Sequence, residues 1–287
     1  MPNPDDSALE TFVWRTLCPS IDVLVDTAAI GTDSMDAEAL HRFRVALRRL
    51  RCDLRSLRPF LSKPLVTSLR ERLSELDELV RPVRDGDVMV ERLTATAAKV
   101  HNRIDPDIVE ALHHNLVAAA ATARYTLVSE ISSGRFDALF GELAGLRDSE
   151  FMRVDLTAEF PVCLERVNKE LWKRVKRTAR VLTDDADDDA LHALRVLIKR
   201  SRYLAEASVP ELGRSAKRRA SAAAQAQLVL GEHQDSVVFS HTLVAMQQPT
   251  PAHMLAINAL LAVESDARRK LRKRWRKVWR RMDRQRM

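Results

Sequence analysis

Glycine and aromatic residues are scarce in this chain, and both shortages argue against a β-rich fold. Seven glycines are spread over 287 residues, and Phe, Trp and Tyr together make up 5% of the chain. Strands favour aromatic and β-branched residues, whereas the abundant Ala, Leu, Arg and Glu favour helix. The composition therefore predicts an all-α protein, long enough for one large domain or two modest ones.

Cysteine and long apolar stretches are also in short supply. The three cysteines (Cys18, Cys52 and Cys163) are widely spaced, so neither a disulfide framework nor a cysteine metal site is expected. No apolar run approaches the roughly 20 residues that span a bilayer. The first residues lack the basic and apolar segments of a secretory signal. We expect a cytoplasmic protein with reduced thiols.

Positive charge is in excess. Lys and Arg number 47 against 40 Asp and Glu, which gives a formal net charge of +7 and a sequence pI of about 9.6. This excess of positive charge suits an anionic partner but does not identify that partner. The placement of the cations along the chain is more informative.

One predicted helix, residues 41–58, carries a basic stripe beside its core face. At about 100° per residue, its apolar side chains gather on one side, and cations recur next to them at i, i+3, i+7, i+10 and i+14. These cations are His41, Arg44, Arg48, Arg51 and Arg55. Like charges at i,i+3 and i,i+4 destabilise a helix by roughly 0.2–0.5 kcal/mol per pair. An anion that bridges several guanidinium groups would relieve this repulsion, so the stripe predicts an anion-binding surface.

The same spacing returns 151 residues later, which indicates an internal repeat. The second copy consists of His192, Arg195, Lys199, Arg200 and Arg202, which match His41, Arg44, Arg48, Arg49 and Arg51. A third stripe with this spacing precedes the second copy and consists of Arg166, Lys169, Lys173, Lys176 and Arg180. Arg49 and Arg200 belong to the repeat but point off the stripes.

The repeat predicts two helical halves, residues 1–145 and 146–287, with the division placed where the helical pattern weakens. We expect a helix to stop at Arg81-Pro82 and another to open at Asp85 or Asp87, and we expect the equivalent Asp235 to open a helix after Gly231. A carboxylate at a helix start is usually an N-cap, so a catalytic role for these three is disfavoured.

Together these motifs resemble the two signatures of the CHAD family, the conserved-histidine α-helical domain. The two stretches that match the signatures are His41-x2-Arg44-x3-Arg48-Arg49-x-Arg51 and His192-x2-Arg195-x3-Lys199-Arg200-x-Arg202-Tyr203-x2-Glu206. The segments around Arg84-Asp85 and Leu230-Gly231 resemble the helix-start motifs of that family, although Leu79-Val80 departs from its usual Leu-Gly. The resemblance implies two four-helix bundles related by a pseudo-twofold axis. It also implies a central basic channel that binds inorganic polyphosphate, and association with polyphosphate granules.

We therefore predict a stand-alone, non-enzymatic polyphosphate-binding protein that needs no cofactor and no metal. Some relatives carry a fused triphosphate-tunnel domain, but its Glu-x-Glu-x-Lys signature does not occur here. The residues predicted to bind polyphosphate are His41, Arg44, Arg48, Arg49, Arg51, Arg55, Arg166, Lys169, Lys173, Lys176, His192, Arg195, Lys199, Arg200 and Arg202.

Two other functions stay open at this point. A helical nucleic-acid-binding protein would use the same stripes for phosphates of another polymer. A metal-dependent phosphohydrolase has less support, because the sequence shows no carboxylate cluster and no Gly-rich phosphate loop. His41 and His192 are more suited to donating to the anion or to a helix-capping contact than to a metal or phosphorelay role, since no second histidine follows either of them at i+4.

The C-terminal segment 268–286 is basic all round, with Trp275 and Trp279 one turn apart. We expect a final bundle helix whose outer charges extend the anion surface. Contact with RNA or with membrane phosphates is the alternative.

Overall fold

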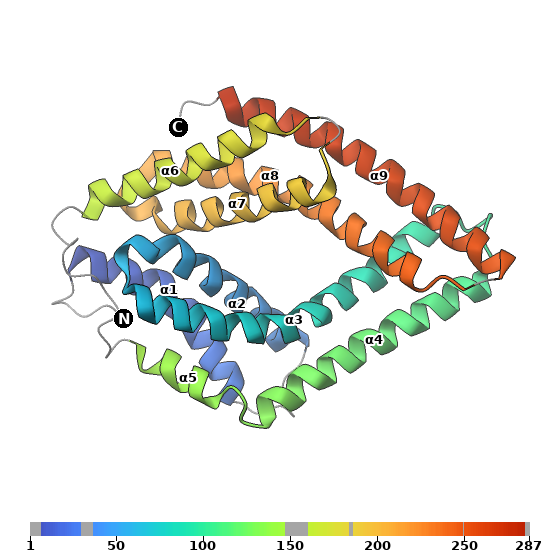
Figure 1. The fold of residues 1–287 in the computed structure, drawn as a ribbon, viewed down its shortest axis with the longest axis horizontal. Coiled ribbons are helices and arrows are strands. Elements are labelled where there is room, and N and C mark those ends of the chain that lie inside the picture. Colours follow the sequence, from blue (N-terminus) through green and yellow to red (C-terminus); the bar gives the residue numbers. More distant parts are fainter. Residues whose placement is uncertain (1–6, 30–36, 147–159, 184–185, 249, 285–287) are drawn as a thin grey trace. The chain divides into compact units, whose positions relative to one another are not determined.

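The structure, a computed structural model, describes residues 7–29, 37–146, 160–183, 186–248 and 250–284. Within these ranges the chain is built from helices and contains no β-strand (Figure 1), which confirms the predicted all-α class. The helices are α1 (Ala8–Ala29), α2 (Ala37–Leu57), η2 (Arg58–Phe60), α3 (Lys63–Ala97), α4 (Pro106–Ser132), α5 (Asp137–Ala144), α6 (Phe160–Val181), α7 (Asp188–Ala207), α8 (Val209–Ala245) and α9 (Pro251–Arg284).

Backbone contacts divide the chain into two units, each assembled from three stretches. Unit 1 consists of Met1–Arg81, Arg124–Arg174 and Lys199–Ser221, and unit 2 consists of Pro82–Ala123, Val175–Ile198 and Ala222–Met287. The region of weak pattern used to divide the chain at residue 145 runs into residues 147–159, which lie outside the described residues. That division and the pseudo-twofold relation between bundles stay predictions.

The core of unit 1 joins α1, α2 and α5 and is held by phenylalanine rings. The Phe12 and Phe160 ring centroids are 5.2 Å apart, and Phe60 meets Phe160 at 5.8 Å. Phe43 of α2 meets Phe140 of α5 at 6.5 Å. All five rings are buried, and each contributes about 1.5–3 kcal/mol through burial. The apolar side of α2 therefore faces this core, as its periodicity predicted.

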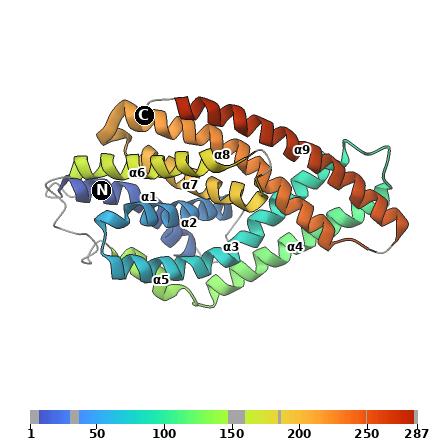
Figure 2. The same ribbon diagram turned by 45° about the horizontal axis from the view of Figure 1, so that its top comes forward.

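Unit 2 has a separate apolar core where the ends of four helices meet. Leu93 of α3, Leu112 of α4, Phe239 of α8 and Leu260 of α9 belong to one cluster of buried side chains. These helix ends lie side by side in both Figure 1 and Figure 2. Gly86 allows α3 and α4 to approach closely, because a Cβ atom there would lie 2.7 Å from the Cβ of Ala120.

A buried polar cluster interrupts this core. Glu264 of α9 is 2% exposed, and its carboxylate accepts hydrogen bonds from Arg92 Nη2 at 2.7 Å and from Thr96 Oγ1 at 2.8 Å. Ser236 Oγ donates a third at 2.5 Å. These donors keep the pKa of Glu264 below its usual value despite the opposing effect of burial. The carboxylate is thus an ionised link between α3, α8 and α9.

The predicted helix break at Arg81-Pro82 is wrong. Helix α3 runs from Lys63 to Ala97 with Pro82 inside it, so Asp85 and Asp87 lie within the helix and cannot cap its start. An internal proline costs about 3 kcal/mol through the lost hydrogen bond and the ring clash. Val80 and Val83 on either side of it are buried, and their packing keeps the helix in place.

The predicted helix start at Asp235 is wrong as well. Helix α8 continues from Val209 to Ala245 through both Gly231 and Asp235. Its backbone leaves the helical region at Gly213, where φ is 56° and ψ is −128°. This left-handed conformation favours glycine, and it produces a kink near the start of α8.

Candidate anion-binding site

Helix α2 places its basic stripe along the edge of the unit 1 core. Arg44, Arg48 and Arg51 are half-buried, whereas His41 and Arg55 at the two ends are exposed. The apolar stems of the half-buried arginines pack on the protein, which limits where their charged heads can go. The buried Nε of Arg48 has no hydrogen-bond partner among the described residues. The stripe therefore holds Arg48 in place with one buried donor unsatisfied.

Several positively charged side chains gather around Arg200 of α7. Its Nε donates to Ser56 Oγ at 3.2 Å, and its Nη2 donates to the carbonyl oxygen of Arg55 at 2.8 Å. Burial, followed by the charges on Arg55 and Arg174, lowers the pKa of Arg200 to about 10. Arg200 stays protonated at neutral pH. Its surroundings disfavour this positive charge, and a bound anion would stabilise it.

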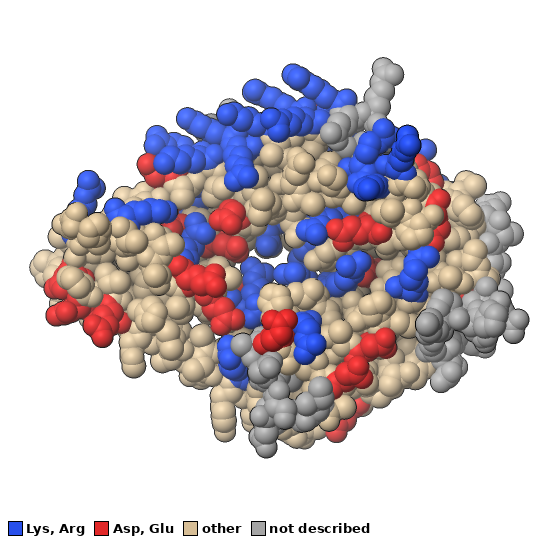
Figure 3. Space-filling view, turned by 180° about the vertical axis from the view of Figure 1, so that it is seen from behind, with Lys and Arg blue, Asp and Glu red and all other residues tan. Residues whose placement is uncertain are grey.

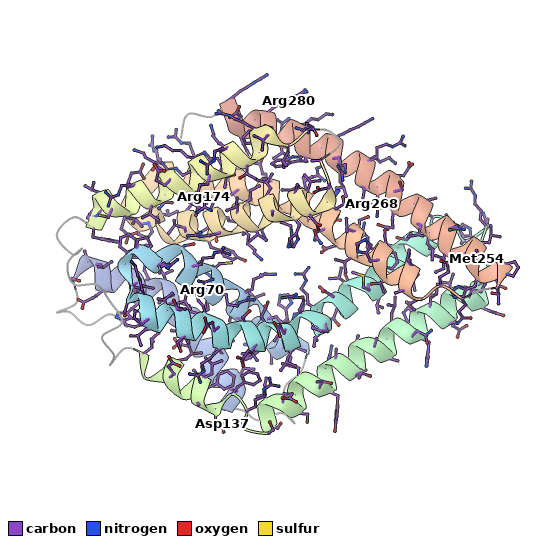
Figure 4. All side chains as sticks on the ribbon, viewed as in Figure 1. Arg70, Asp137, Arg174, Met254, Arg268 and Arg280 are labelled. Atoms are coloured by element: carbon purple, nitrogen blue, oxygen red, sulfur yellow. The ribbon has the colours of Figure 1, made fainter. Side chains whose placement is uncertain are left out.

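Arg70 of α3 lies in the same positive environment. Burial and the charges on Arg55, Arg58 and Arg51 lower the pKa of Arg70. We call this group the arginine cluster; its members, from α2, η2, α3, α6 and α7, are Arg51, Arg55, Arg58, Arg70, Arg174 and Arg200. Arg70 and Arg174 are labelled in Figure 4. Arg51 has a counter-charge, since it forms an ion pair with Asp77.

Sequence reasoning missed three members of this cluster, Arg58, Arg70 and Arg174. Arg58 directly follows the α2 stripe, and Arg174 directly follows Lys173 in the third stripe, so proximity in sequence could have suggested both. Arg70 is followed by Glu71 and Arg72, a mixed pattern typical of a solvated helix face. Only the tertiary fold brings it to the other arginines.

Arg49 is held by acidic and aromatic neighbours, in keeping with its predicted position off the stripe. Its Nε lies 3.6 Å from Asp53 Oδ2, its Nη1 lies 4.0 Å from Glu206 Oε2, and its guanidinium carbon lies 5.4 Å from the Tyr203 ring centroid. Asp53 is 1% exposed, and burial raises its pKa to about 7 although the charge on Arg49 opposes the shift.

The second stripe contributes Lys199 and Arg202 to unit 1. The positive charge on Lys199 acts on the half-buried thiol of Cys52, and so do the charges on Arg48 and Arg51. Burial nevertheless raises the pKa of that thiol. Arg202 donates to Glu206 Oε1 at 2.7 Å, so its charge is compensated.

His192 and Arg195 of this stripe belong to unit 2. His192 is exposed, and Arg195 is half-buried next to Gly231 of α8, where a Cβ atom would lie 3.8 Å from Arg195 Nε. The two motifs expected to start helices instead meet across α3 and α8, because Arg84 Nη2 donates to Asp235 Oδ1 at 3.2 Å.

The third stripe, on α6, has counter-charges of its own. Lys169 Nζ lies 3.3 Å from Glu165 Oε1, and Lys173 Nζ lies 2.7 Å from Glu170 Oε1. Arg166 and these two lysines are exposed members of unit 1. Lys176 belongs to unit 2, where its Nζ donates to the carbonyl oxygen of Asp283 at 2.9 Å. The stripe is thus less available to an anion than the arginine cluster is.

Two kinds of feature are absent from the described residues. They contain no group of three or more His, Cys, Asp or Glu side chains arranged to hold a metal ion. None of their helices is long and apolar enough to cross a membrane.

Fold and site together define an all-α protein whose unit 1 carries a cluster of arginines suited to an anion. The family model described as the CHAD domain matches residues 23–244. The chain therefore belongs to the CHAD family, as the two signatures predicted.

Relatives and solved structures agree with this assignment. The uncharacterized protein Rv2226 of Mycobacterium tuberculosis is 26% identical over 250 residues, which cover 81% of this chain and 45% of that protein. The chain thus spans about half the length of the curated relatives it matches. The structure of PptA from Streptomyces chartreusis has a TM-score of 0.77 at 17% identity and covers 98% of this chain and 100% of that one. The CHAD domain from the plant Ricinus communis has a TM-score of 0.72 at 24% identity, covering 98% and 94%. Both likenesses show the fold.

Proposed function

We propose that this protein binds inorganic polyphosphate through the arginine cluster and the stripes around it, and that it does so without hydrolysing the chain. The observation that carries the proposal is the gathering of arginines from several helices around half-buried Arg200, whose guanidinium group is held by Ser56 Oγ and by the carbonyl oxygen of Arg55. Membership of the CHAD family supports the choice of polyphosphate among anions.

A linear polyanion suits this arrangement physically. Successive turns of a helix are about 5.4 Å apart, similar in scale to successive phosphates, so side chains one turn apart can each engage a different unit. At an effective dielectric constant of about 20, one close charge pair is worth about 4 kcal/mol before desolvation and ordering costs. Net affinity would therefore come from many contacts and fall steeply with salt, by analogy with nucleic-acid binding.

The test is a charge-reversal pair in the two repeated stripes, Arg48→Glu with Lys199→Glu. We expect the affinity for long-chain polyphosphate, measured by calorimetry, to fall at least tenfold while helical content by circular dichroism stays unchanged. The matched control is Lys99→Glu with Arg103→Glu, two exposed cations with no described acidic partner, which changes the net charge by the same amount. Unchanged affinity in the first variant, or an equal loss in the control, would contradict the proposal.

Two finer points belong to the same proposal. Incubation of the purified protein with polyphosphate and divalent metal ions should release no phosphate, and release would favour the hydrolase alternative. In cells, a fluorescent fusion should gather at polyphosphate granules in the cytoplasm, and it should disperse when Arg48 and Lys199 are both reversed.

A further inference from the structure

The C-terminal helix α9 separates its residues sharply into two faces. Trp275, Trp279 and Met282 are buried, and the two tryptophan rings stack with centroids 6.2 Å apart. The exposed residues from 269 to 284 are all cations, namely Arg269, Lys270, Lys273, Arg274, Lys277, Arg280, Arg281 and Arg284. We call these eight the α9 band. Figure 3 shows a row of Lys and Arg side chains along the upper edge, over α9.

The geometry of the α9 band is regular. At about 100° and about 1.5 Å per residue, the eight side chains fill an arc of about 140° along some 22 Å of helix. Every other residue of 269–284 falls outside that arc, so no acidic, apolar or neutral side chain interrupts it. A solvated helix face normally mixes charge signs, because neighbouring like charges at i,i+3 and i,i+4 repel. The band is therefore not an ordinary solvated face.

The inward-facing cations of the same helix behave differently. Arg268 Nη1 donates to Ser240 Oγ at 2.5 Å, Arg272 Nη2 lies 2.6 Å from Asp188 Oδ1, and Arg276 Nη1 donates to the Leu182 carbonyl oxygen at 2.7 Å. In the band, Arg269 alone has a described acidic partner, Asp266 at 2.7 Å. Figure 4 shows Arg280 on the outer side of α9 and Arg268 on the side toward α8. The inner cations thus stabilise unit 2, whereas seven of the eight cations in the α9 band have no described acidic partner.

The geometry points to double-stranded DNA as the partner of the α9 band, bound through its phosphates and without sequence preference. The major groove of B-form DNA is about 12 Å wide and admits one α-helix, with a phosphate backbone on each side. Because the α9 band spreads over an arc of about 140°, its side chains can reach both phosphate backbones at once. This inference does not rest on polyphosphate binding, since the α9 band shares no residue with the arginine cluster.

Other polyanions fit the α9 band less well. A membrane-surface helix presents its apolar face to lipid, but here the tryptophans face the protein core. Single-stranded nucleic acid is bound by stacking on aromatic side chains, and the band has none. The major groove of A-form RNA is deep and narrow, so a helix cannot enter it. A single polyphosphate chain would contact only a narrow line of side chains along the helix. The cations at the two edges of the arc would then have no phosphate to bind.

The experiment compares two variants of the full chain that each lose four positive charges. The first removes the centre of the α9 band (Lys273→Gln, Arg274→Gln, Lys277→Gln, Arg281→Gln), and the control removes exposed cations elsewhere (Lys99→Gln, Arg103→Gln, Arg214→Gln, Lys217→Gln). Binding to a mixed-sequence DNA duplex is measured by fluorescence anisotropy over a series of salt concentrations. RNA duplex and long-chain polyphosphate are measured in parallel.

We expect the α9 variant to bind duplex DNA at least tenfold more weakly than the wild type. The slope of log K against log salt should fall by about 3.6, since each of the four lost phosphate contacts contributes about 0.9. The control should stay within about threefold of the wild type, because its four cations lie outside the α9 band and add only a screened background. Unchanged DNA affinity in the α9 variant would overturn the inference. So would an equal loss in the control, equal wild-type affinity for RNA duplex, or a polyphosphate loss as large as the DNA loss.

Discussion

Replacing Arg200 by methionine should separate a binding role from a structural one. Methionine fills a similar volume and removes the charge. The folded pKa of Arg200, about 10, lies below the ordinary value of an arginine, so the protonated side chain destabilises the fold at every pH below about 10. Removing the charge at neutral pH should therefore remove a penalty.

The size of that penalty follows from the pKa difference. It corresponds to about 3 kcal/mol, which is an upper limit because Arg200 is only half-buried and solvent screens part of the interaction. The substitution also removes the hydrogen bonds to Ser56 and to the Arg55 carbonyl, together worth about 2 kcal/mol. We expect the free energy of unfolding without ligand to stay level or to rise by about 1 kcal/mol.

The affinity for polyphosphate should move in the opposite direction. With its central guanidinium gone, the arginine cluster should bind the chain about tenfold more weakly, and polyphosphate should raise the melting temperature of the variant less than that of the wild type. Urea unfolding without ligand and calorimetry with polyphosphate measure the two quantities. A loss of stability above about 1 kcal/mol together with unchanged affinity would show that Arg200 is structural, and the reasoning would be refuted.

Two further predictions concern buried carboxylates. Asp53 has a pKa of about 7 in the folded protein against 3.8 in the unfolded chain, so the fold should lose stability as pH rises through this window. Relative to Asp53→Asn, the wild type should lose about 3 kcal/mol between pH 5 and pH 9 in urea unfolding, and a difference that does not vary with pH would contradict this assignment. Glu264→Ala should lower the free energy of unfolding by about 3–5 kcal/mol, because half-buried Arg92 would lose its close carboxylate partner and keep only the longer contact to Glu232 at 3.9 Å. A loss below about 1 kcal/mol would mean that water reaches Arg92.

Local periodicity predicted much of this molecule. Composition predicted the all-α class, and spacing within a single segment predicted the core face of α2 with Phe43. The helix junctions were harder, because Pro82 and Gly231 are signals of a break in isolation. Burial of Val80 and Val83 outweighs the proline in the fold, and no local pattern contains that information.

The candidate site shows the same division between local and tertiary information. The stripe from His41 to Arg55 could be read from one helix, whereas Arg70 joins the arginine cluster only through the packing of α3 in unit 1. The sequence also gave no sign that Lys169 and Lys173 would be compensated by Glu165 and Glu170, although the i,i+4 and i,i+3 spacings allow both ion pairs. Positive charge is visible in sequence, but its neutralisation depends on side-chain geometry.

The position of Cys52 has a practical consequence. Its half-buried thiol lies among the charges of Lys199, Arg48 and Arg51, so an anion bound there would shield it from a bulky alkylating reagent. With Cys18, the other half-buried cysteine, replaced by serine, the rate of thiol labelling becomes an internal reporter of occupancy that needs neither a labelled ligand nor an added fluorophore. Cys52 thus lies where we expect the ligand to bind, and the reactivity of its thiol can report that binding.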